Sequence, residues 1–324
     1  MSTILVKTEN VKKHFKVENG IFSDKKKVVH AVDGVNMEII TGETLALVGE
    51  SGCGKSTLGR LIIRLMEPTS GSVYFEGQDI SKLNGSSIRK KRREMQIVFQ
   101  DPYASLNPRM NVKDIISEPL LTHKIVGKKD IEGKVAELME MVGIRKDYMM
   151  RYPHMFSGGQ RQRIGIARAV ALDPKFVVCD EAVSALDVSV QAQIINLLQD
   201  LQEEKKLTYL FISHDLNVVK HIANRVCVMF LGKIVEVGKK EDIFKQPLHP
   251  YTRFLMESSP IMNPHLRDKE KLILKGEMPS PIDLPRGCRF STRCPFCKER
   301  CKESEPELLS KDGREVACHF PLDA

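Results

Sequence analysis

The sequence predicts an α/β fold in which one strand of a parallel sheet leads into a phosphate-binding loop. Residues 44–48 form an apolar run, and Gly49–Ser56 directly after it fits the pattern G-x-x-x-x-G-K-[ST]. Two later apolar runs, Phe176–Asp180 and Thr208–Ser213, are almost continuous, as strands buried on both faces are. Stretches with helical spacing alternate with these runs, which favours a parallel sheet. The predicted helices cover residues 57–65, 159–172 and 189–205.

The chemistry of the loop follows from its residue types. Glycines allow the backbone to curl, so that successive N–H groups point inward at an anion. The helix that follows adds the positive end of its dipole. Lys55 is placed to reach the outer phosphates of a nucleotide, and the Ser56 hydroxyl can hold Mg²⁺. The candidate phosphate-binding residues are Gly49, Glu50, Ser51, Gly52, Cys53, Gly54, Lys55, Ser56 and Thr57.

The remaining segments predict further elements around this core. Short strands at Ile4–Val6, 28–32 and 35–40 indicate an antiparallel, β-rich start, and further strands are expected at 71–77 and 97–100. Helical spacing over 111–150 predicts a helical insertion that ends near Gly143. Prolines accumulate from about residue 260, where we expect an irregular tail. We therefore divide the chain into a nucleotide-binding domain over 1–260, with a helical part at approximately 101–170, and a cysteine-rich extension over 261–324.

Composition limits the class of protein. The 324 residues are 42% hydrophobic and 28% charged, and no apolar run reaches 18 residues, so no transmembrane helix is predicted. The first ten residues lack the basic start and apolar centre of a signal peptide, so we expect the protein in the cytosol. The net charge of +8 suits an anionic membrane surface or nucleic acid. The basic run Arg89–Arg93 is interpreted first as the solvated face of a short helix.

A second nucleotide signal lies at the end of the strand Phe176–Asp180. An apolar strand that ends in an acid is what a Mg²⁺-holding Walker B site needs, so Asp180 is a candidate Mg²⁺ residue. Glu181 directly after it has the chemistry of a general base for an attacking water. Together with the phosphate-binding loop, this pair predicts an NTPase site rather than a strand that merely ends in charge.

A third signal, Phe156-Ser-Gly-Gly-Gln160, resembles the signature sequence of the ATP-binding cassette (ABC) ATPases. The other motifs of that family follow in order over roughly residues 3–260. Phe156 stands where many members have Leu, and both residues are apolar. The matching positions are Phe15 for the aromatic that stacks on adenine, Gln100 for the Q-loop, Ser184–Asp187 for the D-loop and His214 for the switch histidine.

The resemblance implies a RecA-like P-loop NTPase core with an antiparallel β subdomain and a helical signature subdomain. Ser157 and the backbone N–H groups of Gly158 and Gly159 make a second anion site at a helix start. The family arrangement is a head-to-tail dimer, with ATP between one subunit's loop and its partner's signature. The implied phosphate and Mg²⁺ residues are Lys55, Ser56, Gln100 and Asp180, with Glu181 activating water and His214 at the γ-phosphate. Gln160 and Asp187 complete the implied nucleotide contacts.

Three local features resemble the oligopeptide, dipeptide and nickel importer branch: Gln100–Arg109, His249–Thr252 and the cysteine tail. The N-terminal segment is similar to the subunit type usually called F. This resemblance implies a second ATPase subunit, either a related D-type subunit or a second copy of this chain. It also implies two membrane permease subunits and an external binding protein, with this chain on the cytoplasmic face of the membrane. The alternatives are a nickel or other small-solute importer and a soluble ABC ATPase that acts on ribosomes or DNA. We expect no nucleic-acid partner, because the chain has one phosphate-binding loop and no sustained heptads.

The tail has the cysteine spacing Cys288-x₅-Cys294-x₆-Cys301-x₁₆-Cys318. A short, proline-rich tail cannot bury much of a core, so a metal would stabilise it. Four thiolates suit a [4Fe–4S] cluster or structural Zn²⁺, and the importer resemblance implies the cluster, with these four cysteines as ligands. Cys297 is either a zinc ligand or a spare thiol, and His319 is a further possible zinc ligand.

Overall fold

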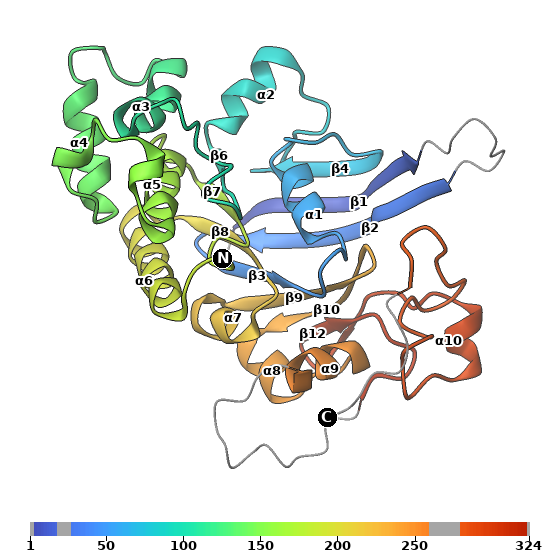
Figure 1. The fold of residues 1–324 in the computed structure, drawn as a ribbon. Helices are drawn as coiled ribbons and strands as arrows, with labels where there is room; N and C mark the ends of the chain where they lie inside the picture. The colour runs from blue at the N-terminus through green and yellow to red at the C-terminus, as the bar shows by residue number, and fades with distance from the viewer. Residues whose placement is uncertain (1–2, 18–26, 259–278, 323–324) are drawn as a thin grey trace. The chain divides into compact units, whose positions relative to one another are not determined.

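The computed structural model describes residues 3–17, 27–258 and 279–322 (Figure 1). The chain forms two compact units, which we describe separately. The phosphate-loop unit comprises Met1–Ile40, Thr44–Lys82 and Ser213–Ala324, and the signature-helix unit comprises Thr41–Glu43 and Leu83–Ile212. The domain boundary that we expect near residue 260 lies outside the described residues. In the described part of the chain, no helix has the length and apolar character needed to cross a membrane.

The phosphate-loop unit begins with an antiparallel sheet in the order β2-β1-β4-β5. Its strands are β1 (Ile4–Val17), β2 (Lys27–Ile40), β4 (Ser70–Phe75) and β5 (Gln78–Asp79). The sequence predicts the antiparallel character, but it underestimates two strands, which are each 14 residues long. The second half of β1 carries basic and polar residues on a more exposed surface, and register shifts interrupt its pairing with β2. Both features hide the alternation of side chains that marks a strand.

Five further strands in this unit lie in the order β11-β12-β10-β9-β3. The strand β3 (Thr44–Val48) is buried along its whole length and pairs in parallel with β9 (Arg225–Phe230). The others, β10 (Lys233–Lys239), β11 (Leu309–Lys311) and β12 (Arg314–Val316), pair antiparallel. The helices are α1 (Lys55–Ile62), α7 (Leu216–Ile222), α8 (Lys240–Lys245), α9 (Pro250–Ser258) and α10 (Glu299–Glu303).

The described part of the extension is more ordered than the sequence predicts. We expect an irregular tail, but the structure contains α10 and the strands β11 and β12 (Figure 1). Because β12 pairs with β10, the extension continues a sheet of the nucleotide-binding core. Phe290 belongs to the same buried cluster as Phe230 of β9 and Tyr251 of α9. Strands of three residues are too short to show a period of two, which explains why the sequence does not reveal them.

The signature-helix unit has three parallel strands in the order β8-β7-β6, which confirms the predicted parallel α/β fold. The strands are β6 (Met95–Val98), β7 (Phe176–Asp180) and β8 (Thr208–Ser213). A helical layer forms where α3, α4 and α5 contact one another (Figure 1). The helices are α2 (Gly85–Arg92), α3 (Val112–Thr122), α4 (Ile131–Met141), α5 (Gly158–Val170) and α6 (Val188–Lys205). Two 3₁₀ turns, η1 (Lys146–Tyr148) and η2 (Pro153–Met155), precede α5.

Candidate functional site

The phosphate-binding loop connects β3 to α1, as the sequence predicts. Gly54 caps α1 with φ of 108°, a left-handed value that favours glycine. A Cβ atom on Gly54 would lie 2.0 Å from the carbonyl oxygen of Ala31, and one on Gly49 would lie 2.2 Å from that of Met229. The loop therefore packs backbone against backbone between β2 and β9. Only glycine allows this close approach of the loop backbone to both strands.

Lys55 is held inside this loop, with only 4% of its surface exposed. Its Nζ donates to the carbonyl oxygens of Gly49 and Glu50, both at 2.8 Å. The third contact is to Cys53 Sγ at 3.8 Å, and thiol sulfur is a weak acceptor. An incoming phosphate oxygen can replace that sulfur while the two carbonyls continue to orient the ammonium group.

The acidic pair at the end of β7 lies in the signature-helix unit. Asp180 is 2% exposed, and the Glu181 N–H donates to the carbonyl oxygen of Ile212 at 3.1 Å. Glu181 has φ of 49°, which aims it away from the direction of the strand. The Nε2 of Gln100 donates to Glu181 Oε2 at 2.9 Å. The structure thus brings together the predicted Q-loop glutamine and the predicted base.

The start of α5 is shaped by a capping box. The Ser157 hydroxyl accepts from the Gln160 N–H at 3.3 Å, and Gln160 Oε1 accepts from the Ser157 N–H at 3.0 Å. A Cβ atom on Gly159 would lie 2.4 Å from a methyl group of Val190, so glycine allows α5 to approach α6 closely. Asp187 caps α6. The N–H groups of Gly158 and Gly159 belong to the first turn of α5, where helix N–H groups have no partner within the helix.

Three other predicted nucleotide residues lie in the phosphate-loop unit. Ser56 is in the first turn of α1. His214 is exposed between β8 and α7, next to Asp215, whose side chain caps α7. Phe15 lies on β1 with 37% of its surface exposed, and the Lys13 ammonium is 5.3 Å from the centre of its ring.

All four predicted cluster ligands, Cys288, Cys294, Cys301 and Cys318, line one small cavity in the extension, and Cys297 is not among its lining residues. Burial raises the pKa of Cys288 to about 12 and that of Cys294 to about 11. His319 also lines the cavity, but its Nε2 donates to the Ser304 carbonyl oxygen at 2.9 Å. Three phenylalanine side chains also line the cavity: Phe290, Phe296 and Phe320.

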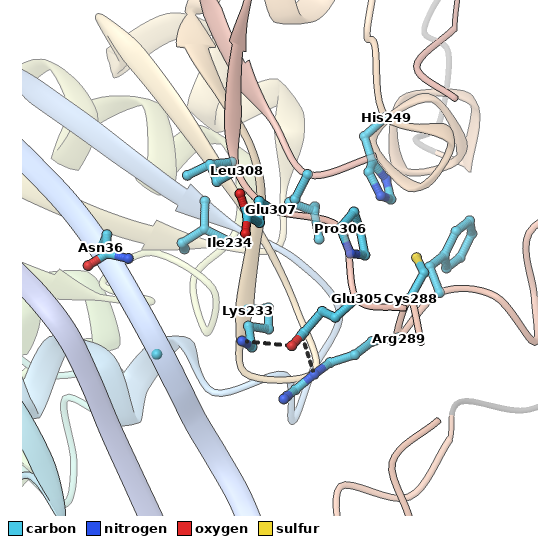
Figure 2. A pocket seen from close by; sticks show the side chains of 14 residues that line it. Asn36, Lys233, Ile234, His249, Cys288, Arg289, Glu305, Pro306, Glu307 and Leu308 are labelled. Atoms are coloured by element: carbon cyan, nitrogen blue, oxygen red, sulfur yellow. Dashed lines mark hydrogen bonds and ion pairs between the residues drawn. The ribbon is translucent and has the colours of Figure 1, made fainter. Parts of the chain in front are cut away.

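His249 also lines this cavity, and it lines a neighbouring pocket of about 500 Å³ (Figure 2). The imidazole is 1% exposed, and burial lowers its pKa to about 3. The Tyr251 N–H donates to His249 Nδ1 at 3.0 Å, so the ring proton is on Nε2. Among the described residues, that buried Nε2 has no hydrogen-bond partner. Glu305 and Lys233 also line the larger pocket, where they form an ion pair at 3.2 Å (Figure 2).

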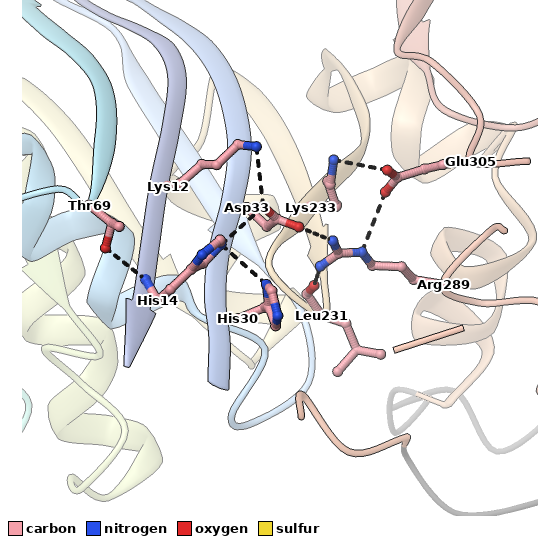
Figure 3. Close-up of polar contacts among 9 residues, drawn as sticks. All are labelled: Lys12, His14, His30, Asp33, Thr69, Leu231, Lys233, Arg289 and Glu305. Atoms are coloured by element: carbon pink, nitrogen blue, oxygen red, sulfur yellow. Dashed lines mark hydrogen bonds and ion pairs between the residues drawn. The ribbon is translucent and has the colours of Figure 1, made fainter. Parts of the chain in front are cut away.

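A polar network connects the extension to the antiparallel sheet (Figure 3). Arg289 donates to the Asp33 carboxylate and to the carbonyl oxygen of Leu231, and its Nε is 3.4 Å from Glu305. Asp33 Oδ1 lies 3.1 Å from His14 Nε2, which in turn is 3.2 Å from His30 Nδ1. Burial alone would raise the pKa of Asp33, but the hydrogen bond and charge of Arg289 lower it to about 2. The network fastens the extension to β2.

The structure also shows a contact to the phosphate-binding loop that sequence reasoning missed. Arg293 of the extension donates to both carboxylate oxygens of Glu50 at 3.0 Å, although 243 residues separate the two in the chain. The Glu50 N–H donates to the Tyr251 hydroxyl at 2.8 Å. Glu50 is a predicted loop residue, but no sequence pattern indicates its partners.

Two family models match the chain. The model described as "ABC transporter" matches residues 32–184, and the model described as "Oligopeptide/dipeptide transporter, C-terminal region" matches residues 235–301. The oligopeptide transport ATP-binding protein AppF of Bacillus subtilis is 52% identical, with 98% of this chain and 97% of the relative covered. The dipeptide transport ATP-binding protein DppF of Escherichia coli is 49% identical, with 98% and 95% covered.

Solved structures give the same result for the fold. A dimeric, post-hydrolysis state of the ATP-binding cassette MJ0796 with ADP and Pi matches with a TM-score of 0.65 at 29% identity, covering 73% of this chain and 99% of that one. The Clostridium perfringens cbiO1, part of the ABC transporter complex cbiONQ, matches with a TM-score of 0.64 at 29% identity, covering 75% and 92%.

We predict that Asp33→Asn destabilises the protein by about 1–2 kcal/mol at neutral pH, because the folded carboxylate has a lowered pKa. A lowered pKa contributes stability above the usual value of 3.8, and that contribution disappears as the pH falls toward about 2. Denaturant unfolding of both proteins should therefore show a difference at pH 7 that shrinks steadily below pH 4. A difference that does not change with pH would mean that the carboxylate charge does not carry the effect.

Proposed function

This chain belongs to the ATP-binding subunits of oligopeptide and dipeptide ABC transporters, and we propose that it binds ATP on residues 49–57 and hydrolyses it to drive peptide import. The observation that carries the proposal is the combination of a complete phosphate-binding loop with about half-identity to peptide-transport ATPases along nearly the whole chain. The extension strengthens it, because the matching C-terminal model is specific to this branch of transporters.

In the proposed mechanism, the loop binds the phosphates through its inward N–H groups and through Lys55, which Gly49 and Glu50 already orient. Ser56, Gln100 and Asp180 are the proposed Mg²⁺ residues. Hydrolysis requires little covalent chemistry, mainly positioning and charge stabilisation. Glu181 orients and deprotonates the attacking water, while Gln100, which donates to its carboxylate, keeps the base in place.

The remaining nucleotide contacts are proposed to form between subunits. A second anion site at the start of α5, with Ser157, Gly158 and Gly159, serves the nucleotide held by the partner ATPase. Gln160 supports this site through the capping box, and Asp187 lies at the start of α6. His214 is the proposed γ-phosphate contact, and Phe15 the adenine contact. The partner is a related D-type ATPase or a second copy of this chain.

We further propose that the pair of ATPases attaches to two permease subunits on the cytoplasmic face of the membrane, and that an external binding protein delivers the peptide. The dimeric state of the similar cassette MJ0796 and the peptide-transport names of the relatives support a pair of ATPase subunits in a peptide transporter. The basic net charge of +8 suits a position beneath an anionic lipid surface.

We propose that the four cavity cysteines, Cys288, Cys294, Cys301 and Cys318, hold a [4Fe–4S] cluster. Such a cluster supplies a covalent cross-link between four chain segments and a centre that can exchange one electron. The convergence of the four cysteines on one cavity, without Cys297, supports this set of ligands. Structural Zn²⁺ is the alternative, held by the same four thiolates or with Cys297 or His319 as a ligand. The contact of His319 Nε2 to Ser304 occupies one of its ring nitrogens.

The Nε2–H of His249, which has no hydrogen-bond partner among the described residues, supports the presence of an anionic group in the same cavity. A buried N–H without a partner costs roughly 1–3 kcal/mol, so native structures seldom leave one unsatisfied. In the described chain His249 Nε2–H lacks a partner, and its ring borders the cavity of the four cysteines. Sulfur atoms of a metal–thiolate cluster carry negative charge and accept hydrogen bonds, which stabilises the reduced state. The four cysteine thiolates and the Nε2–H of His249 therefore both suit a [4Fe–4S] cluster in this cavity.

We predict that Glu181→Gln slows ATP hydrolysis at least about 100-fold in the assembled transporter, because the variant cannot accept a proton from water. ATP affinity should be retained, since the amide keeps the shape of the side chain. Glu140→Gln, at an exposed position of α4, is the matched control and should hydrolyse ATP normally. Normal turnover by Glu181→Gln would exclude Glu181 as the base.

We predict that the anaerobically purified chain contains iron and acid-labile sulfide. His249→Phe should keep the iron but lower the midpoint reduction potential by on the order of tens of millivolts, because it removes a hydrogen bond that favours the reduced cluster. His249→Asn, which retains an N–H donor, should recover part of this loss, and His319→Gln should keep both iron and potential.

Metal analysis and a redox titration followed by visible absorbance measure these quantities. Zinc without sulfide in the wild-type chain would refute the cluster. An unchanged potential in a His249→Phe protein that contains iron would refute only the role of His249.

A further inference from the structure

The cysteine-rich extension contacts the phosphate-binding loop directly. Arg293 lies between Phe290 and Cys294, and its N–H donates to the Phe290 carbonyl oxygen in a turn at 3.0 Å. The side chain extends from this turn to Glu50, the second residue of the loop. Both carboxylate oxygens of Glu50 are 3.0 Å from Arg293 Nη1. The side chains are 9% and 23% exposed, so water screens this ion pair much less than a surface pair.

Glu50 is held from three directions. Its side chain accepts from Arg293, and its N–H donates to the Tyr251 hydroxyl. Its carbonyl oxygen accepts from Lys55 Nζ at 2.8 Å. The same peptide segment that positions the phosphate-binding lysine is therefore fixed by one residue of the extension and one residue of α9.

Aromatic side chains packed around the turn restrain the position of Arg293. Phe290, three residues before it, packs on Phe230 and Tyr251 with ring centres 5.3 and 5.4 Å apart. The guanidinium lies 5.9 Å from the centre of the Phe254 ring, within reach of a cation–π interaction. The turn that carries Arg293 is thus anchored in the core cluster that also contains Ala46 and Val48 of β3, the strand that leads into the loop.

We propose that Arg293 is a positioning residue for ATP binding, through which the extension holds the phosphate-binding loop in its binding conformation. The proposal rests on the ATPase function proposed above and adds a residue outside every nucleotide motif of the chain. Arg293 acts through Glu50 and Lys55 rather than by touching the nucleotide.

A double-mutant cycle tests the proposal on the full-length chain, purified with its metal. We expect Arg293→Gln to weaken ATP binding about tenfold, which corresponds to about 1.4 kcal/mol. Glu50→Gln should weaken it similarly, and the double variant should be no worse than either single variant, because both remove the same contact. Arg293→Lys keeps a charge but loses the planar fork of donors, so it should recover part of the affinity.

Two control variants separate positioning from general loosening of the extension. Arg300→Gln, at an exposed position of α10, should leave ATP affinity unchanged. Arg289→Gln breaks the attachment to Asp33 without touching the loop, so it should lower stability more than ATP affinity. The readouts are equilibrium ATP binding, metal content and thermal unfolding.

The proposal fails if Arg293→Gln binds ATP with wild-type affinity while it retains its metal, or if the effects of Arg293→Gln and Glu50→Gln simply add. It also fails if Arg289→Gln weakens ATP binding as much as Arg293→Gln, since loosening of the extension would then explain the loss. If the wild-type chain itself does not bind ATP, the proposed function fails rather than the role of Arg293.

Discussion

The described part of the extension has too few buried apolar side chains to form a core of its own. Its order therefore depends on contacts with the rest of the phosphate-loop unit. Among its described residues the buried apolar side chains are few: Phe290, Cys301, Val316 and Ala317. Such a segment orders only if it packs on another surface or binds a metal. It does the first by adding β12 to β10 and inserting Phe290 beside Phe230 and Tyr251. The four convergent cysteines are suited to the second.

This packing brings arginine side chains of the extension to acidic side chains of the phosphate-loop unit. Arg289 reaches Asp33 on β2, and Arg293 reaches Glu50 of the phosphate-binding loop. Both arginine side chains are less than a tenth exposed, so each contact is formed largely out of water, where a hydrogen-bonded ion pair is strongest and a broken pair most costly. The extension, which carries none of the predicted nucleotide motifs, is therefore connected to the loop that we propose binds phosphate.

The sequence predicts well which strands and helices carry the motifs, and it predicts the long-range contacts poorly. Gly49–Ser56, Asp180 and Ser157 are recognisable because each motif is a short run whose geometry depends on its neighbours. The sequence does not reveal the full length of β1, because its polar face and its register shifts conceal the period of two. It does not reveal the strands of the extension, because they are too short to show that period. Arg293 and Glu50 are 243 residues apart in the sequence, and no motif near either residue predicts that the two are in contact. The orphan Nε2 of His249 likewise becomes visible only when burial and partners are known.

Hydrogen exchange at the phosphate-binding loop tests most directly whether the extension holds it. The Glu50 amide donates to the Tyr251 hydroxyl, so its exchange rate reports whether the loop is held. The measurement compares the wild-type chain with its Arg293→Gln variant, which lacks the ion pair of the extension with Glu50. We predict faster exchange across residues 49–56 in the variant, with the strands β7 and β8 unchanged. Equal exchange of the loop in both proteins would contradict this role of the extension.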